Sequence, residues 1–110
     1  MGARQHTRTR RERLQVAREK GTHTALEWEV LRHIFGGACV RCGNRNYRVE
    51  KDHIEPVYQG GSDAIWNLQP MCAPCNTSKG PEAIDHRDAA YPRWEEHFAI
   101  VMETLSERLR

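Results

Sequence analysis

Four cysteines form two pairs with the same internal spacing. The pairs, Cys39/Cys42 and Cys72/Cys75, are both C-x-x-C sequences, and 29 residues lie between them. Each such turn presents two sulfur atoms, and Zn²⁺ prefers four tetrahedral thiolates at about 2.3 Å. The separation exceeds the roughly 15 to 20 residues that are commoner in zinc sites, so a pair of strands must project between the pairs and return. The spacing predicts one structural zinc ion, with free buried thiols, redox chemistry or another metal as alternatives.

The segment between the cysteine pairs carries residues suited to phosphodiester hydrolysis. This reaction needs a base that deprotonates water and a cation that neutralises the charge developing at phosphorus and on the leaving oxygen. His53 can be the base, and Asp52 offers a hard carboxylate oxygen of the kind that Mg²⁺ or Mn²⁺ prefers. Neighbours on an extended strand point to opposite faces. We therefore expect a distortion at the end of this strand, near Glu55-Pro56.

Several short motifs follow one another in a fixed order between and around the two cysteine pairs. They are D-H-I-x-P at 52–56, G-G-S at 60–62, N-L-Q-P-M-C at 67–72 and C-N-x-x-K-G at 75–80. In this order and spacing the sequence resembles the HNH endonucleases, the zinc-stapled branch of the His-Me finger (ββα-metal) nucleases. The resemblance covers about residues 39–80, a little under half of the chain. The resemblance rests on residue type, order and spacing together, because an Asp-His pair by itself is weak evidence for the family.

The resemblance implies roles for two asparagines. Asn67 matches the central asparagine of the family, which braces the backbone after the first strand and so aims His53. Asn76 matches the third position, where the family's name calls for a histidine that shares the metal with the aspartate. An amide oxygen is still a hard ligand, so Asp52 and Asn76 would hold one Mg²⁺ or Mn²⁺, with Ni²⁺ as a less favoured candidate. The implied reaction is metal-dependent hydrolysis of DNA that leaves a 3′-hydroxyl and a 5′-phosphate.

The elements that must position these residues can be predicted from local patterns. Thr24 and Glu27 have the spacing of a capping box, which predicts a helix that starts there and ends at Gly36-Gly37. Residues 47–57 indicate a short strand, residues 66–71 a second extended piece, and Pro74 the first turn of a short helix. A final helix carries an apolar stripe, which we interpret as core packing: Trp94, Phe98, Val101, Met102, Leu105 and Leu109. We expect a small α+β fold, a ββα-metal motif with a structural zinc site, flanked by N- and C-terminal helices.

The chain has 110 residues, 38% of them hydrophobic, which supports one domain with a small hydrophobic core. A bound metal ion would add to the stability that this core provides. We divide it into a basic N-terminal arm or helix at 1–22 and an HNH nuclease domain at 23–110. The core motif spans 39–80, and the C-terminal helix about 92–109.

No window approaches the ~20 apolar residues of a membrane span, and the start has no apolar secretory segment. The expected location is the cytoplasm of a bacterial or phage-infected cell.

Basic residues predict the partner. The net charge is only +2, but residues 1–20 carry seven positive side chains against two negative ones. With this arm, five residues near the motif are candidates for contacts with DNA phosphates: Arg41, Arg45, Arg48, Lys51 and Lys79. One active site cuts one strand, so nicking by a monomer and double-strand cleavage by a homodimer both stay open. The small size resembles phage-encoded HNH proteins that act beside the genome-packaging terminase, a candidate partner.

Two alternative functions remain open besides the nuclease. One is a catalytically inactive zinc-stabilised DNA-binding module, and another is a zinc-stabilised protein-interaction domain. Ser62 and Asp63 are expected to cap a turn. Two sets are expected to have no site role. These are three tryptophans in the core, Trp28, Trp66 and Trp94, and five histidines on the surface or on helix faces, His6, His23, His33, His86 and His97.

Overall fold

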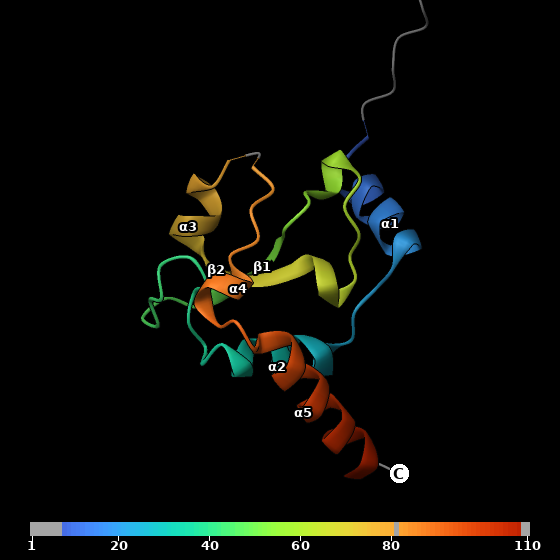
Figure 1. Ribbon diagram of the computed structural model, residues 1–110. Helices are drawn as coiled ribbons and strands as arrows, with labels where there is room; N and C mark the ends of the chain where they lie inside the picture. Colours follow the sequence, from blue (N-terminus) through green and yellow to red (C-terminus); the bar gives the residue numbers. More distant parts are fainter. Residues whose placement is uncertain (1–7, 81, 109–110) are drawn as a thin grey trace, which may run out of the picture.

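The computed structural model describes residues 8–80 and 82–108 (Figure 1). Residues 1–7 of the predicted arm, Pro81 at the predicted helix stop and Leu109 of the apolar stripe lie outside this range. The elements, in chain order, are α1 (Arg10–Lys20), α2 (Ala25–Ile34), β1 (Val49–His53), the 3-10 turns η1 (Val57–Gln59) and η2 (Ile65–Asn67), β2 (Leu68–Cys72), α3 (Ala73–Ser78), α4 (Arg87–Ala90) and α5 (Trp94–Arg108).

The centre of the fold is a ββα unit. β1 and β2 pair antiparallel, with Val49 opposite Cys72 and His53 opposite Leu68. α3 follows β2 without a loop and has Pro74 in its first turn, as the sequence predicts. All five residues of β2 are buried, because α2 and α3 both contact this strand. The predicted small α+β fold with a ββα unit and flanking helices is confirmed.

α2 begins at the predicted capping box. The Glu27 amide donates to Thr24 Oγ1 at 3.0 Å, and the Thr24 amide donates to Glu27 Oε1 at 2.7 Å. α2 lies beside α5 on one side of the strands (Figure 1), and Leu31 is completely buried between them and β2. The apolar stripe of α5 packs against this core, as predicted, through Phe98, Val101, Met102 and Leu105.

The prediction of three core tryptophans is correct for two. Trp28 and Trp94 are 9% and 7% exposed and belong to the core cluster, but Trp66 is 66% exposed. Trp66 lies in the 3-10 turn η2, where Ile65 is the residue that points into the core. A turn of three residues buries one side, so the largest side chain of η2 stays outside.

α1 is docked on the rest of the molecule. Ala17 is 1% exposed, and its carbonyl accepts a hydrogen bond from the Asp63 amide at 3.2 Å. Lys20 Nζ donates to the Gly60 carbonyl at 2.6 Å. Both contacts reach the loop between η1 and η2, beside which α1 lies in Figure 1. The basic N-terminal segment thus includes a helix that is attached to the loop following β1.

In the described part of the chain, no helix is both long and apolar enough to cross a bilayer.

Candidate active site and zinc site

The two cysteine pairs meet at one point. Cys39 and Cys42 lie in the turn after α2, Cys72 ends β2, and Cys75 lies in α3. All four sulfur atoms lie within 4.8 Å of one another, and Cys42 Sγ is 3.8 Å from Cys72 Sγ. Four sulfurs about 2.3 Å from a central zinc ion would be separated by about 3.8 Å. The cluster therefore has the geometry of a closed, structural zinc site, in agreement with the sequence.

The thiols of this cluster differ in acidity. Burial tends to raise the pKa of Cys39, but backbone hydrogen bonds, chiefly at Cys42, outweigh burial and lower this pKa to about 7. Burial and the neighbouring thiols raise the pKa of Cys75 to about 12, and burial also raises the pKa of Cys72. Four sulfurs so close together cannot all ionise unless a cation compensates their charge. Zinc must therefore displace protons from this cluster when it binds.

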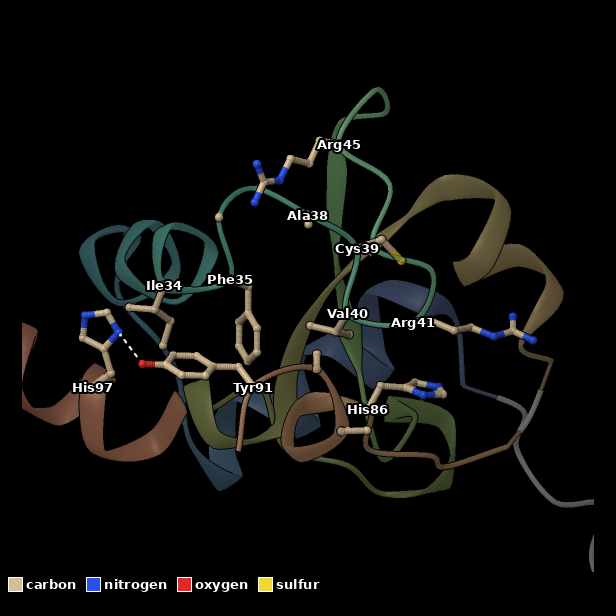
Figure 2. Close-up of a pocket in the computed structure, with 14 residues that line it drawn as sticks. Ile34, Phe35, Ala38, Cys39, Val40, Arg41, Arg45, His86, Tyr91 and His97 are labelled. Atoms are coloured by element: carbon tan, nitrogen blue, oxygen red, sulfur yellow. Dashed lines mark hydrogen bonds between the residues drawn. The ribbon is translucent and has the colours of Figure 1, made fainter. Parts of the chain in front are cut away.

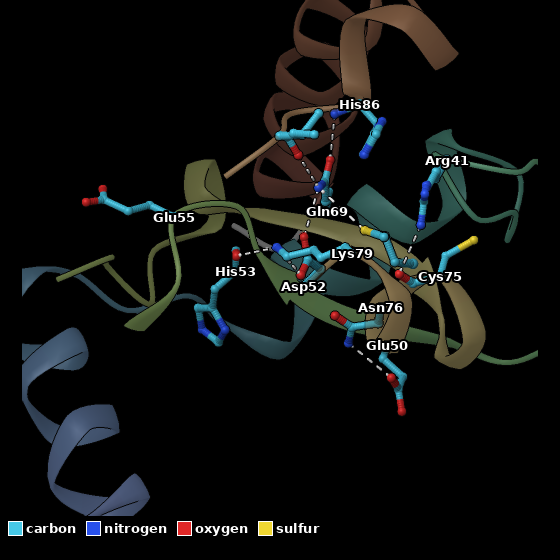
Figure 3. Close-up of polar contacts among 12 residues, drawn as sticks. Arg41, Glu50, Asp52, His53, Glu55, Gln69, Cys75, Asn76, Lys79 and His86 are labelled. Atoms are coloured by element: carbon cyan, nitrogen blue, oxygen red, sulfur yellow. Dashed lines mark hydrogen bonds and ion pairs between the residues drawn. The ribbon is translucent and has the colours of Figure 1, made fainter. Parts of the chain in front are cut away.

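Asp52 is a buried carboxylate whose two oxygens both have partners. It is 3% exposed and lies on β1 opposite Gln69 of β2. Lys79 Nζ lies 2.6 Å from Oδ1, and Gln69 Nε2 donates to Oδ2 at 2.8 Å (Figure 3). Gln69 is itself fixed, because its Nε2 also donates to the Ile84 carbonyl and its Oε1 accepts from the His86 amide, each at 2.9 Å. The orientation of Asp52 is therefore set by a continuous polar network.

His53 is the last residue of β1, and its ring lies near a loop. Its Nε2 is 2.8 Å from Asp63 Oδ1, and its carbonyl accepts from Lys79 Nζ at 3.1 Å. Asp52 and His53 both line one cavity of about 290 Å³. β1 ends at His53, just before Glu55-Pro56, where the sequence predicted a distortion that would let Asp52 and His53 share a site. The arrangement places a carboxylate and an imidazole beside one solvent-filled space.

Asn67 joins two loops. Its Oδ1 accepts from the Glu55 amide at 2.9 Å, and its Nδ2 donates to the Glu55 carbonyl at 3.0 Å and to the Ser62 carbonyl at 2.7 Å. Gly61 makes this close approach possible, because a Cβ there would overlap the Glu55 carbonyl. The side chain of Asn67 thus braces the backbone after β1, the contact that the family resemblance implies. Asn67 does not line the cavity of Asp52 and His53.

Asn76 reaches the same cavity from α3. Its Nδ2 donates to Glu50 Oε1 at 3.1 Å (Figure 3), which orients the amide group. The nitrogen is thereby turned to Glu50, and the amide oxygen is on the other side of the group. Asp52, His53 and Asn76 therefore meet at one cavity, although they come from a strand, a strand end and a helix.

Residues 39–82 match the family model described as HNH endonuclease. This segment, less than half of the chain, is similar to the HNH endonucleases. No curated protein and no solved structure shows significant similarity to the chain. The matched HNH segment contains both cysteine pairs, β1, β2 and α3, and so includes every residue that lines the predicted site except those contributed by α1.

The basic residues predicted to contact DNA divide into groups around the HNH segment. Lys51 and Lys79 line the cavity of Asp52, but Lys79 is held inside it by Asp52 and the His53 carbonyl. Lys51 Nζ lies 5.8 Å from the centre of the Trp28 ring. Arg48 is exposed outside this cavity.

The two remaining basic candidates lie along another cavity. Arg41 and Arg45 line a larger hollow of about 640 Å³ between α2, the first cysteine turn and α4 (Figure 2). Arg41 also donates to Ser78 Oγ at 2.8 Å. Tyr91 lies in the same hollow, where its hydroxyl lies 3.2 Å from His97 Nδ1. This hollow contains none of the predicted catalytic residues.

Sequence reasoning missed Gln69 and Asp63 as contributors to the HNH site, and it included Arg10 and Arg13 only as members of the basic arm. Arg10 and Arg13 of α1 line the cavity, Gln69 holds Asp52, and Asp63 contacts His53. The turn cap predicted at Ser62-Asp63 is made by Ser62, whose hydroxyl accepts from the Ala64 amide, while the Asp63 carboxylate turns to His53. The motif N-L-Q-P-M-C already contained Gln69, and a polar residue between apolar neighbours in a predicted strand is the sequence signal that could have found it.

Proposed function

We propose that this protein is a divalent-metal-dependent DNA endonuclease in which His53 activates the attacking water. The observation that carries the proposal is the meeting of Asp52, His53 and Asn76 at one cavity inside an HNH segment. HNH proteins are generally nucleases that act on DNA. A base and two hard oxygen donors at one solvent-filled space are the groups that phosphodiester hydrolysis needs.

The residues of the cavity fit a hard divalent cation. Asp52 would supply a carboxylate oxygen and Asn76 its amide oxygen, and such ligands suit Mg²⁺ or Mn²⁺. Lys79 already places a positive charge on Oδ1 of Asp52, so a cation would compete with Lys79 for that oxygen. When bound, the cation would neutralise the charge that develops at phosphorus and on the leaving oxygen. The four cysteines, whose sulfur atoms one zinc ion would saturate, would serve the fold alone.

The chain's own residues would then perform three tasks. His53 takes a proton from the water that attacks phosphorus, and Asn67 holds the loop next to His53 through its three backbone hydrogen bonds. Arg10 and Arg13 line the cavity from α1 and would supply positive charge for the phosphates that flank the cleaved bond. Cleavage would leave a 3′-hydroxyl and a 5′-phosphate, as the resemblance implies.

Cleavage of supercoiled plasmid tests this proposal. Protein that keeps its zinc but lacks loosely bound cations is assayed with Mg²⁺, Mn²⁺, Ni²⁺ or EDTA. We expect nicking that requires a cation and that falls by about 10²- to 10⁴-fold in His53→Ala. The matched control is His33→Ala, which removes an exposed histidine of α2 outside the cavity and should leave the rate unchanged.

The second candidate, an inactive DNA-binding module, is favoured by one observation, the ion pair between Lys79 and Asp52 that occupies a predicted metal ligand. It predicts a DNA gel shift without cleavage in any of the cations. Such a result would refute the endonuclease proposal and leave the zinc site and the fold unaffected.

We also propose a biological setting, a phage protein that takes part in DNA packaging. Its support is the resemblance to small phage HNH proteins that act beside the terminase. Co-purification with the terminase large subunit, measured with and without DNA, tests this partner. Analytical ultracentrifugation of the zinc-loaded protein tests the monomer against the homodimer.

A further inference from the structure

Three groups converge on the carboxylate and carbonyl of Asp63. His53 Nε2 lies 2.8 Å from Oδ1. His23 Nδ1 lies 2.7 Å from the Asp63 carbonyl oxygen and 3.6 Å from Oδ2, and Arg18 Nε lies 3.8 Å from Oδ2. The side chain of Asp63 is only 12% exposed. A carboxylate in this setting is held in one orientation, since each of its oxygens faces a different partner.

The contact between Asp63 and His53 decides which ring nitrogen of His53 carries the proton. An ionised carboxylate can only accept hydrogen bonds, so Nε2 of His53 must donate. In a neutral imidazole the other nitrogen, Nδ1, then has a free electron pair. A general base needs such a pair, so Nδ1 is the atom that takes the proton from water. The same division of roles operates in Ser-His-Asp triads, where the aspartate selects the tautomer of the histidine.

Asp63 is fixed in turn by the N-terminal part of the chain. Its amide donates to the Ala17 carbonyl of α1 at 3.2 Å. His23 lies between α1 and α2, and because a carbonyl oxygen only accepts, His23 Nδ1 donates to the Asp63 carbonyl. From the other side, Asn67 Nδ2 holds the Ser62 carbonyl next to Asp63. His23 was predicted to lie on the surface or on a helix face, but it lies between two helices with only 10% of its side chain exposed.

We propose that Asp63 is a positioning residue that holds His53 with its proton on Nε2, and that Arg18 and His23 hold Asp63 in place. The inference rests on the proposed nuclease function and deepens it. The N-terminal helix α1 is thereby part of the catalytic geometry. The HNH match begins at residue 39, so two of the residues that set up His53 lie outside the matched segment.

Asp63→Asn gives a directional test because it keeps the shape of the side chain. Arg18 Nε lies 3.8 Å from Oδ2 of Asp63, and its positive charge favours the amide oxygen on that side, which places the introduced NH₂ group towards His53 Nε2. Nε2 must then accept, which moves the imidazole proton to Nδ1 and removes the base. We expect kcat for plasmid nicking to fall by about 10²-fold or more, while KM for DNA and the zinc content stay unchanged.

The tautomer itself is read by long-range ¹⁵N–¹H NMR of the imidazole rings. Wild type should show a proton on His53 Nε2, and Asp63→Asn should show it on Nδ1. The matched control is Asp88→Asn, an equal change at a carboxylate that accepts from Trp94 Nε1 far from the cavity, which should alter neither the tautomer nor kcat.

Each outcome decides one of the two proposals. A wild-type His53 without a proton on Nε2 overturns the positioning role, and this measurement needs no variant to fold. A folded Asp63→Asn protein with wild-type kcat overturns it as well. If wild type cleaves no DNA but the tautomer moves as expected, the nuclease proposal fails and the positioning of His53 by Asp63 stands.

Discussion

Lys79 Nζ lies 2.6 Å from Oδ1 of Asp52, and the two side chains are only 9% and 3% exposed. Lys79 comes from the end of α3, and Asp52 from β1, so this ion pair joins two of the elements that line the cavity. The pair places a positive charge where a divalent cation would bind. In the proposed mechanism, the ammonium group of Lys79 and a divalent metal ion would therefore compete for Oδ1 of Asp52.

Lys79→Met should destabilise the protein and make its stability depend on divalent cations. Removal of one partner of a buried ion pair costs about 3 kcal/mol or more, because the remaining carboxylate keeps its desolvation cost. Mn²⁺ should restore part of this loss by binding Asp52, and should stabilise the variant more than wild type. Urea unfolding with and without Mn²⁺ measures both effects. Equal stabilisation of the two proteins by Mn²⁺ would argue against a cation site at Asp52, and Lys51→Met is the matched control.

Zinc removal should unfold the protein, and acid should promote the removal. Structural zinc contributes on the order of 10 kcal/mol to folding in small domains. Cys72 and Cys75 have raised pKa values, so zinc must displace their protons at neutral pH, and its affinity falls as the pH falls. Below a pH of about 7 the Cys39 proton must be displaced too, so the pH dependence becomes steeper there. Competition with a chromophoric chelator between pH 6 and about pH 8 measures the affinity. An affinity independent of pH would contradict the thiolate cluster.

Gly61→Ala should open the contact between the two loops that Asn67 joins. The new Cβ would overlap the Glu55 carbonyl, so backbone must shift, at a cost of about 2 to 3 kcal/mol. Gly37→Ala is the control, because Gly37 has a φ of 71° and nothing within 4 Å of the added Cβ, so its cost is backbone strain of about 1 kcal/mol. Thermal unfolding of both variants gives the comparison. Similar losses in the two variants would show that the loops do not need their close approach.

Arg10→Gln combined with Arg13→Gln should weaken DNA binding without slowing the chemical step. Each phosphate contact that is lost lowers the slope of log K against log salt by about 0.9, so the double variant should lose nearly two units. KM should rise while kcat stays the same, since these arginines line the cavity but neither take the proton nor hold the cation in the proposed mechanism. Fluorescence anisotropy over a salt series measures the slope. The matched control removes Arg32 and Arg93, which pair with glutamates in exposed parts of α2 and α5, and an equal effect there would indicate non-specific attraction.

The zinc cluster and the start of α2 could be predicted from the sequence because each depends on a short local motif. A C-x-x-C turn presents both of its sulfurs whatever surrounds it, and the capping box of Thr24 and Glu27 satisfies two amides within one helical turn. The ββα order also follows from short extended segments separated by Gly and Pro turns. Family resemblance added the bracing role of Asn67, whose hydrogen bonds agree with it.

The partners of the site residues were decided by the tertiary structure. Asp63 and His53 lie ten positions apart across irregular loops, where no periodicity indicates which side chains meet. Their contact depends on the close approach of Gly61 to the Glu55 carbonyl. It also depends on α1, because the Ala17 carbonyl accepts a hydrogen bond from the Asp63 amide. The pairing of Lys79 with Asp52 likewise depends on how α3 crosses β1. Residue types and spacing thus determined which chemistry the chain can perform, whereas packing decided which groups orient it, because hydrogen bonds between distant segments form only after the backbone has brought those segments together.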